Sequence, residues 1–257
     1  MNDTKSWNDL DALQAPDYSN YKNLLLIDGN NLSYRWLQRP NHGSFAQDFI
    51  RTVQSLSKSY EASKTIVCFD FGKSYFRMDM SEEYKANRKK PKEEEEVKRY
   101  EAFFEVLNNL PDILDEEVLK FRGVEADDTI GIEATRFADP HNIIVSPDKD
   151  MRQIPSTLWD MKNDVVEITK DDGDRWHLIQ SLSGDPTDGY SGCPGIGVKR
   201  ATELLDKNEN KWEAVCKAYR DRGLSDDDAL LNARLAKILQ KEDFDHDRNQ
   251  PILWTPN

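Results

Sequence analysis

Acidic side chains gather in the middle of this 257-residue chain, between Gly123 and Asp150. Five of the carboxylates there lie at the ends of predicted elements: Glu125, Asp127, Asp128, Asp148 and Asp150. The first three come where a strand would pass into a helix, and the last two directly follow the apolar run 143–145. Because an open α/β sheet binds its ligands beyond the carboxyl ends of its strands, these acids are candidates for a single site.

Neighbouring carboxylates repel one another, and this repulsion raises the pKa of each. A bound divalent cation removes the repulsion, and hard cations such as Mg²⁺ take oxygen ligands. The pattern therefore predicts a metal site. The alternative interpretation is a pair of solvated loops, which is a common setting for any single acid.

Two more acids end predicted strands nearer the N-terminus. The apolar runs 24–27 and 65–69 are continuous, which is typical of strands buried on both faces of a parallel sheet. Asp28 and Asp70 follow these runs, and apolar residues at helical spacing between 45 and 56 predict a connecting helix. Strand, helix and strand form a βαβ unit, so the expected fold class is α/β with a parallel sheet.

Asp185 and Asp188, in a later loop, complete a set of nine acids at or after strand ends. The full set is Asp28, Asp70, Glu125, Asp127, Asp128, Asp148, Asp150, Asp185 and Asp188. A site made of acids alone suits Mg²⁺ or Mn²⁺ rather than zinc. Two such ions about 4 Å apart can activate a water and stabilise the leaving oxygen of a phosphodiester.

A basic segment interrupts the α/β pattern between Gly72 and Arg99. Five of the eight residues from Lys85 to Lys92 are basic, and four glutamates follow them. Such a patch can guide a phosphate backbone over the site even when the whole protein is acidic. The alternative interpretation is that this charged segment is a solvated surface loop.

A glycine-rich turn at Cys193–Gly197 leads into Lys199 and Arg200. Gly195 and Gly197 free the backbone to turn tightly, and the amides that open the next helix form an anion site. This pattern predicts a helix-hairpin-helix that holds a DNA phosphate, with a plain helix–turn–helix connection as the alternative.

The bulk composition excludes several classes of protein. The formal net charge is −13, so the chain is not an obvious nucleic-acid binder by its sum, although its charge is unevenly distributed. Three widely spaced cysteines without a CxxC pair suggest neither a disulfide framework nor a zinc site, and favour a reducing cytoplasm. No P-loop motif is present. The longest apolar strings have about five residues, and a membrane span needs about 20.

The motifs together resemble a known family. LLLIDGNNLSYR, VCFDFGKSYFR, EYKANRKKP, GVEADD, SPDKDM and GDPTDGYSGCPGIGVKRA appear in family order from residue 24 to about 205. The chain is similar to phage 5′-nucleases of the flap endonuclease and 5′→3′ exonuclease superfamily. EYKANRK, DKDMRQIP, GDPTDGYSG and the C-terminal residues further resemble the 5′→3′ exonuclease of T-odd podoviruses, which extends the likeness over most of the chain.

The resemblance implies a twisted parallel sheet flanked by helices, as in PIN-like 5′-nucleases, with a helical arch and a C-terminal helix-hairpin-helix subdomain. Three parts are expected: a polar lead-in at 1–20, an α/β nuclease domain at 21–183 with the arch at about 72–110, and the DNA-binding subdomain at 184–257. The arch is short and broken at Pro91.

The resemblance also implies residue roles. One ion would be held by Asp28, Asp70, Glu125 and Asp127, with Asp128 acting through water; a second would be held by Asp148, Asp150 and Asp188, with Asp185 alongside. Lys85 and Arg88 would be catalytic, by steering the scissile phosphate and stabilising its developing charge. The expected DNA contacts are Tyr34, Arg35, Tyr84, Lys89, Lys90, Gly195, Gly197, Lys199 and Arg200. A K⁺ in the hairpin is a further expected ligand.

The implied reaction is in-line attack of water on a phosphodiester of duplex DNA from its 5′ end, which leaves a 5′-phosphate. Mg²⁺ is the expected cofactor, and Mn²⁺ would substitute. A monomer in the host cytoplasm, with no membrane partner, is expected to act on DNA and on RNA:DNA hybrids. The alternatives are a strict flap endonuclease, an RNase H that removes RNA primers, a non-catalytic DNA-binding factor, and an acidic calcium-binding module, which would lack EF-hand spacing.

Overall fold

The computed structural model describes residues 23–39, 42–86, 93–136, 142–162, 165–245 and 250–256. The expected lead-in at 1–20, the predicted site residues Arg88, Lys89 and Lys90, the arch break at Pro91 and the turn at 163–164 lie outside these residues.

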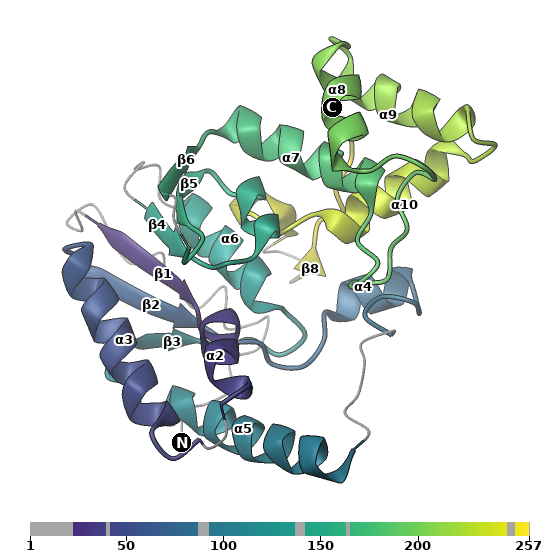
Figure 1. The fold of residues 1–257 in the computed structure, drawn as a ribbon. Helices are drawn as coiled ribbons and strands as arrows, with labels where there is room; N and C mark the ends of the chain where they lie inside the picture. Colours follow the sequence, from purple (N-terminus) through teal and green to yellow (C-terminus); the bar gives the residue numbers. More distant parts are fainter. Residues whose placement is uncertain are drawn as a thin grey trace.

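A six-stranded sheet forms the centre of the molecule, in the order β3-β2-β1-β4-β5-β6 (Figure 1). Its strands are β1 (Leu24–Asp28), β2 (Lys64–Cys68), β3 (Glu117–Leu119), β4 (Asn142–Val145), β5 (Ser156–Trp159) and β6 (Val165–Ile168). All neighbours are parallel except β6, which pairs antiparallel to β5. The predicted α/β class with a mainly parallel sheet is confirmed.

The continuous apolar run of β1 is explained by burial on both faces of the sheet. Leu24 and Leu26 join one core cluster, and Leu25 and Ile27 join the other. None of the four is more than 4% exposed. Because alternate side chains of a strand point to opposite faces, a central strand with two covered faces must be apolar at every position.

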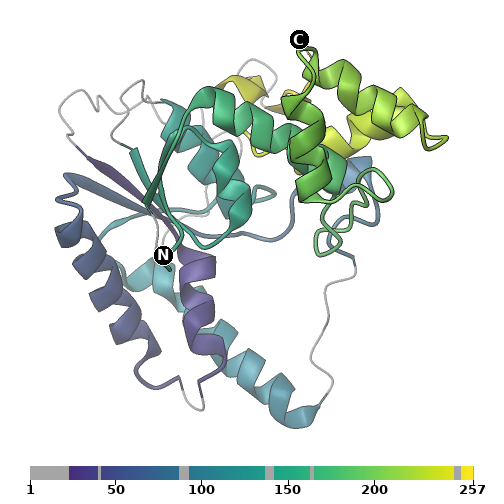
Figure 2. The same cartoon turned by 45° about the horizontal axis from the view of Figure 1, so that its top comes forward.

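Helices cover both faces. The face that holds Leu25 and Ile27 packs against α2 (Gly29–Leu37), α3 (Phe45–Ser59) and α5 (Glu94–Ile113), which lie together under the sheet in Figure 2. The opposite face packs against α6 (Ala126–Arg136) and the short 3₁₀ helix η2 (Lys149–Gln153). The expected arch region, about 72–110, contains α4 (Tyr75–Met80) and much of α5.

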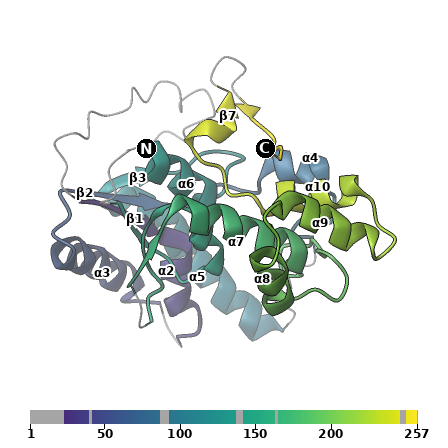
Figure 3. The same cartoon turned by 90° about the horizontal axis from the view of Figure 1, so that it is seen from above.

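A second group of helices follows the sheet: α7 (Lys170–Ser183), α8 (Val198–Asp206), α9 (Lys211–Arg220) and α10 (Asp226–Ala236). Viewed from above, α8, α9 and α10 lie beside the sheet, at the end away from α3 (Figure 3). The described chain then runs through η3 (Lys241–Asp243) to a small antiparallel pair, β7 (Phe244–Asp245) and β8 (Gln250–Pro251).

The expected domain division after residue 183 stays a prediction, and the cores cross it in both directions. Leu178 and Leu182 of α7 belong to the cluster of the C-terminal helices, whereas Ile238 and Phe244 belong to a sheet cluster. No helix in the described ranges is both long and apolar enough to cross a membrane.

Candidate active site

A cavity of about 840 Å³ opens at the carboxyl ends of β1, β2 and β4. Eight of the nine predicted acids line it: Asp28, Asp70, Glu125, Asp127, Asp148, Asp150, Asp185 and Asp188. Three lysines, Lys73, Lys85 and Lys149, line it as well. If all these groups are ionised, five negative charges remain in excess, so the cavity attracts cations.

Parallel register brings the acids of separate strands together. Ile27 of β1 pairs with Val67 of β2 on one side and with Val145 of β4 on the other, so the three strands end side by side. Asp28 ends β1 and caps α2, where its carboxylate accepts the amide of Asn31 at 2.9 Å. Asp28 therefore belongs to a strand end and a helix start at once, which fixes its direction.

The other strand ends use the same device of a carboxylate that binds a backbone amide. Asp70 accepts the amide of Ala126, the first residue of α6, at 2.8 Å. Asp148 caps η2 by accepting the amide of Asp150 at 2.9 Å. These contacts join the loops after β2 and β4 to the helices that carry Asp127 and Asp150.

Glu125 is the acid with the most cationic surroundings. Its Oε1 accepts from Lys85 Nζ at 2.5 Å, and its Oε2 accepts from Tyr84 Oη at 2.7 Å and from Arg77 Nη1 at 3.3 Å. Burial alone would raise the pKa of Glu125, but Lys85 and Arg77 outweigh burial and lower that pKa below its usual value. Glu125 is therefore held as an anion.

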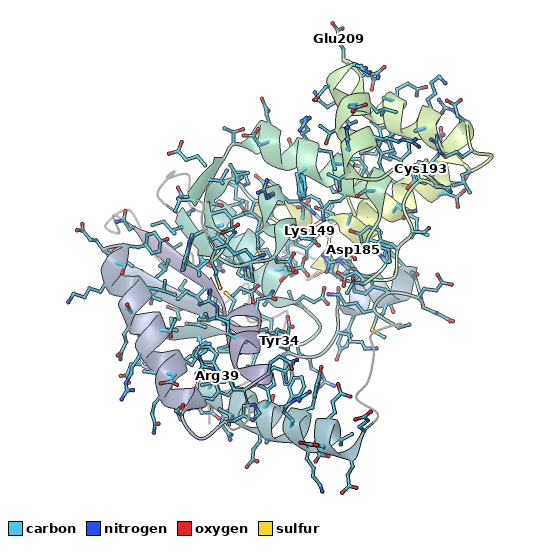
Figure 4. The ribbon with its side chains drawn as sticks, viewed as in Figure 1. Tyr34, Arg39, Lys149, Asp185, Cys193 and Glu209 are labelled. Atoms are coloured by element: carbon cyan, nitrogen blue, oxygen red, sulfur yellow. The ribbon has the colours of Figure 1, made fainter. Side chains whose placement is uncertain are left out.

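The acids after β4 and α7 form a second group at the cavity. Lys149 donates to Asp185 at 2.8 Å, and these two side chains lie together near the centre of Figure 4. Asp150 accepts an amide hydrogen of Gln180 at 2.5 Å. Lys85 Nζ stands 3.6 Å from Asp188, so this one lysine lies between the two groups of acids.

Most of the cavity acids have raised pKa values. Burial raises the pKa of Asp70 to about 6 and that of Asp150 to about 7, and neighbouring carboxylates add to both shifts. Burial also raises the pKa of Asp28, Asp127 and Asp148, with further contributions from nearby acids. A bound cation would favour the ionised form of each, because it removes the repulsion among them.

The donor set fits a hard divalent cation in its chemistry, since it offers carboxylate oxygens without cysteine or histidine. The geometry is less specific: among the residues that the structure describes, no three acidic, histidine or cysteine side chains converge as the ligands of one ion. Several of the oxygens instead face Lys85, Lys149 or Asn31. The cavity therefore has the charge and the ligand type for a metal, whereas its side chains are arranged around the protein's own cations and amides.

The assignment of Asp128 to the metal site is wrong in this structure. Its side chain is fully buried away from the cavity, and Arg77 binds both of its oxygens at 2.7 Å. Oδ1 also accepts the amide of Leu239 at 3.0 Å. Because successive residues of a helix point in different directions, Asp127 faces the cavity and Asp128 faces the C-terminal segment.

The assignment of Tyr84 as a DNA contact is also wrong in this structure. Its side chain is only 3% exposed, and its hydroxyl donates to Glu125, so it is not available to contact DNA in this structure. Arg35 donates to the carbonyl of Met161 at 3.2 Å and does not line the cavity. Tyr34 does line the cavity, 39% exposed and stacked on Phe103, opposite Lys149 and Asp185 (Figure 4).

The predicted hairpin residues form an exposed turn before α8. Gly195 has φ +73°, which glycine adopts without strain. Gly197 caps α8, and no atom lies near the position that a Cβ of either glycine would occupy. Lys199 and Arg200 are exposed, and Arg200 donates back to the carbonyl of Gly195 at 2.8 Å. A DNA-phosphate role for this turn stays a prediction.

Several residues that line the cavity or bind its acids were not predicted from the sequence. Asn31 and Ser146 both donate to Asp28, at 2.6 and 2.7 Å, and Lys149 binds Asp185. Asn31 and Lys149 had a signal, because they stand beside the acids in DGNN and DKD. Tyr100 and Phe104 line the cavity from α5, although their spacing only predicts a helix face.

Comparison with known proteins identifies relatives of this arrangement. The family model for the 5′-3′ exonuclease N-terminal, resolvase-like domain matches residues 23–175. The flap endonuclease of Escherichia phage T5 is 30% identical over 82% of this chain and 79% of its own length. The exodeoxyribonuclease of Enterobacteria phage T3 is 25% identical over 91% of this chain and 93% of its own.

A solved structure of the bacteriophage T5 flap endonuclease, a pseudo-enzyme–product complex with DNA and metal ions, has the same fold. It superposes with a TM-score of 0.73 at 27% identity, over 84% of this chain and 89% of that one. The chain therefore belongs to the 5′-3′ exonuclease family, with the resolvase-like N-terminal domain of that family.

Proposed function

We propose that this protein is a metal-dependent 5′→3′ exonuclease that hydrolyses phosphodiester bonds of duplex DNA from the 5′ end and also cuts 5′ flaps. The observation that carries the proposal is the cavity itself: eight acids from segments as far apart as Asp28 and Asp188 line one space with three lysines. The relatives named flap endonuclease and exodeoxyribonuclease support both activities.

Divalent ions bound by these acids would activate a water and stabilise the leaving oxygen of the phosphodiester. Mg²⁺ is the proposed ion, with Mn²⁺ as a substitute, because all the available ligands are oxygens. Solved structures of the related T5 enzyme contain metal ions, and in one of them the ion is zinc. These structures support a metal requirement. We assign Asp28, Asp70, Glu125 and Asp127 to one ion, and Asp148, Asp150 and Asp188 to another, with Asp185 alongside.

The chain's own cations would position the substrate. Lys85 Nζ lies within the cavity, between Glu125 and Asp188, where it can approach a phosphate oxygen and stabilise its developing charge. Tyr34 presents its ring at the cavity wall for stacking on a terminal base. The turn at Gly195–Gly197, with Lys199 and Arg200, would hold the duplex away from the cut, with a K⁺ as a further proposed ligand.

The test is cleavage of a 5′-labelled duplex with Mg²⁺, repeated after chelation. We expect 5′-phosphate products with Mg²⁺ and none with chelator; equal cleavage in both would contradict the metal requirement. Blunt, gapped, flapped and RNA:DNA substrates measured side by side separate an exonuclease from a strict flap endonuclease and from a primer-removing RNase H.

The setting follows from the same proposal. The described cysteines Cys68, Cys193 and Cys216 are free and buried, as suits a reducing cytoplasm. We propose a monomer that acts on DNA in the cytoplasm of an infected host cell, in replication or recombination of phage DNA.

A further inference from the structure

The chain leaves α10 through residues 235–240, which bind two sides of the active site without lining its cavity. We call residues 235–240 the brace segment. Its backbone carries three carbonyls and two amides that pair with buried side chains of other elements. These contacts begin within the last turn of α10, which ends at Ala236.

On one side the brace segment reaches Asp150 through two glutamines. The side-chain nitrogen of Gln153, Nε2, donates to Ala236 O at 2.6 Å and to Gln180 Oε1 at 2.7 Å. The side-chain oxygen, Gln153 Oε1, accepts the backbone amide of Ile238 at 3.0 Å. Both ends of the Gln153 amide are thus fixed by the brace segment. Gln180 must then present its oxygen to Gln153 and its nitrogen to Asp150.

On the other side the brace segment reaches Glu125 through one arginine. The Arg77 guanidinium is 3% exposed and donates to Leu235 O at 3.2 Å and to Lys237 O at 2.6 Å. The same guanidinium binds Asp128 through both terminal nitrogens, Nη1 and Nη2, and its Nη1 reaches Glu125 at 3.3 Å. The planar fork of an arginine holds such a set of partners in one geometry.

Two glycines let the neighbouring helices approach closely enough for these contacts. A Cβ on Gly131 of α6 would lie 2.3 Å from Leu239 O, so the brace segment rests directly on that helix. A Cβ on Gly173 of α7 would lie 2.3 Å from Gln153 O. Both contacts are with backbone, which cannot move aside as a flexible side chain can.

We propose that the brace segment positions the carboxylates of both groups of acids, with Gln180 as the positioning residue for Asp150 and Arg77 as the positioning residue for Glu125. The inference rests on the proposed nuclease function and adds to it. Outer partners that orient ligands affect metal affinity and turnover, because a carboxylate that rotates freely must be ordered anew by each ion. The site therefore includes the residues that orient its carboxylates, in addition to the side chains that line the cavity.

The first test replaces Gln180 by methionine, which is similar in volume but cannot donate to Asp150. We expect kcat to fall about tenfold, KM for the DNA to stay within twofold, and the dissociation constant for Mn²⁺, measured by calorimetry on the DNA-free protein, to rise about tenfold. Ser181→Ala is the matched control, since Ser181 is equally buried in α7 and its hydroxyl donates only to His177 O. Wild-type values in Gln180→Met would overturn the inference.

A double-variant cycle separates positioning from general loss of structure. In an Asp150→Asn background, Gln180→Met should change the residual rate and the Mn²⁺ affinity by less than twofold, because the carboxylate that it orients is gone. A further tenfold loss would show a merely structural role. If Gln180→Met does not fold, Gln180→Asn, which keeps the amide on a shorter stem, enters the same cycle.

Gly131→Ala tests the brace segment itself, far from any cavity side chain. The added methyl must displace Leu239, so we expect lower kcat and weaker Mn²⁺ binding in a protein that remains folded by circular dichroism. Unchanged values would refute the role of the segment. Absence of cleavage by the wild-type chain would refute the nuclease proposal instead, so the two failures are distinguishable.

Discussion

Glu125 and Asp150 are both mostly buried acids of one cavity, yet their environments drive their pKa values in opposite directions. Glu125 faces Lys85, Arg77 and a tyrosine hydroxyl, and its pKa is lowered. Asp150 faces the amide of Gln180 and the carboxylate of Asp148, and its pKa is raised to about 7.

The difference shows that burial alone does not decide whether a carboxylate ionises. Burial raises the pKa in both cases, and the charges nearby decide the net shift: Lys85 and Arg77 lower the pKa of Glu125, whereas Asp148 adds to the rise for Asp150. The Glu125 side brings its own cations, whereas the Asp150 side depends more on an added cation. The following changes test this contrast, from the largest expected effect to the smallest.

Asp148→Asn removes the acid that raises the pKa of Asp150. We expect the single-turnover cleavage rate to fall at least about a hundredfold, because a charged ligand in the water-poor cavity is lost. DNA affinity, measured by fluorescence anisotropy in Ca²⁺, should stay within about threefold. Equal loss of binding and cleavage would count against a catalytic role.

Lys85→Ala removes the cation shared by the two groups of acids. We expect the chemical step to slow about tenfold or more, and by a larger factor than binding weakens, because the lysine stabilises charge that develops during the reaction. The exposed Lys170→Ala, at the start of α7 and outside the cavity, is the control. A single-turnover rate within twofold of the wild type would refute this role.

Glu125→Gln should destabilise the metal-free protein by about 3 kcal/mol at pH 7, because Lys85 and Arg77 lose a buried anion. The pKa of Glu125 is lowered, so its contribution is present above the unfolded value near 4.5 and is lost as the pH falls through the folded value. Urea unfolding of the wild type and the variant from about pH 3 to pH 8 measures this contribution. The exposed Glu94→Gln is the control, and a variant as stable as that control would remove the contrast.

Asp150→Asn should change the free energy of unfolding in the opposite direction, and by a smaller amount. The raised pKa of about 7 means that the stability due to Asp150 is present below the unfolded value near 3.8 and is lost as the pH rises through 7. In chelator we expect the variant to exceed the wild type by about 1 kcal/mol at pH 8, with a smaller difference at pH 5. Asp174→Asn on the surface is the control, and lower stability at pH 8 would contradict the assignment.

The sheet and the strand-end acids could be predicted because their signals are local. A continuous apolar run such as Leu24–Ile27 marks a strand covered on both faces, and Asp28 follows from where that run stops. The helix predicted between 45 and 56 carries helical periodicity and lies within α3. The three-residue strand β3 was missed because it is too short to show a period.

The roles of residues adjacent in the sequence were harder to predict. Asp127 and Asp128 have the same residue type in adjacent positions, and only the docking of α6 against the brace segment decides that one lines the cavity and the other binds Arg77. Tyr84 illustrates the same limit, because a tyrosine beside a basic run indicates a DNA contact as readily as a buried donor to Glu125.

By itself the sequence determined the α/β class, the positions where strands end, and the set of acids that suits hard cations, since each depends on residues close together in the chain. Only the tertiary structure decided which acid meets which partner, because Lys85, Arg77 and Gln180 lie dozens of residues from the carboxylates they bind. Those partners set the sign of each pKa shift, and the close approach of backbones at Gly131 and Gly173 brings them into place.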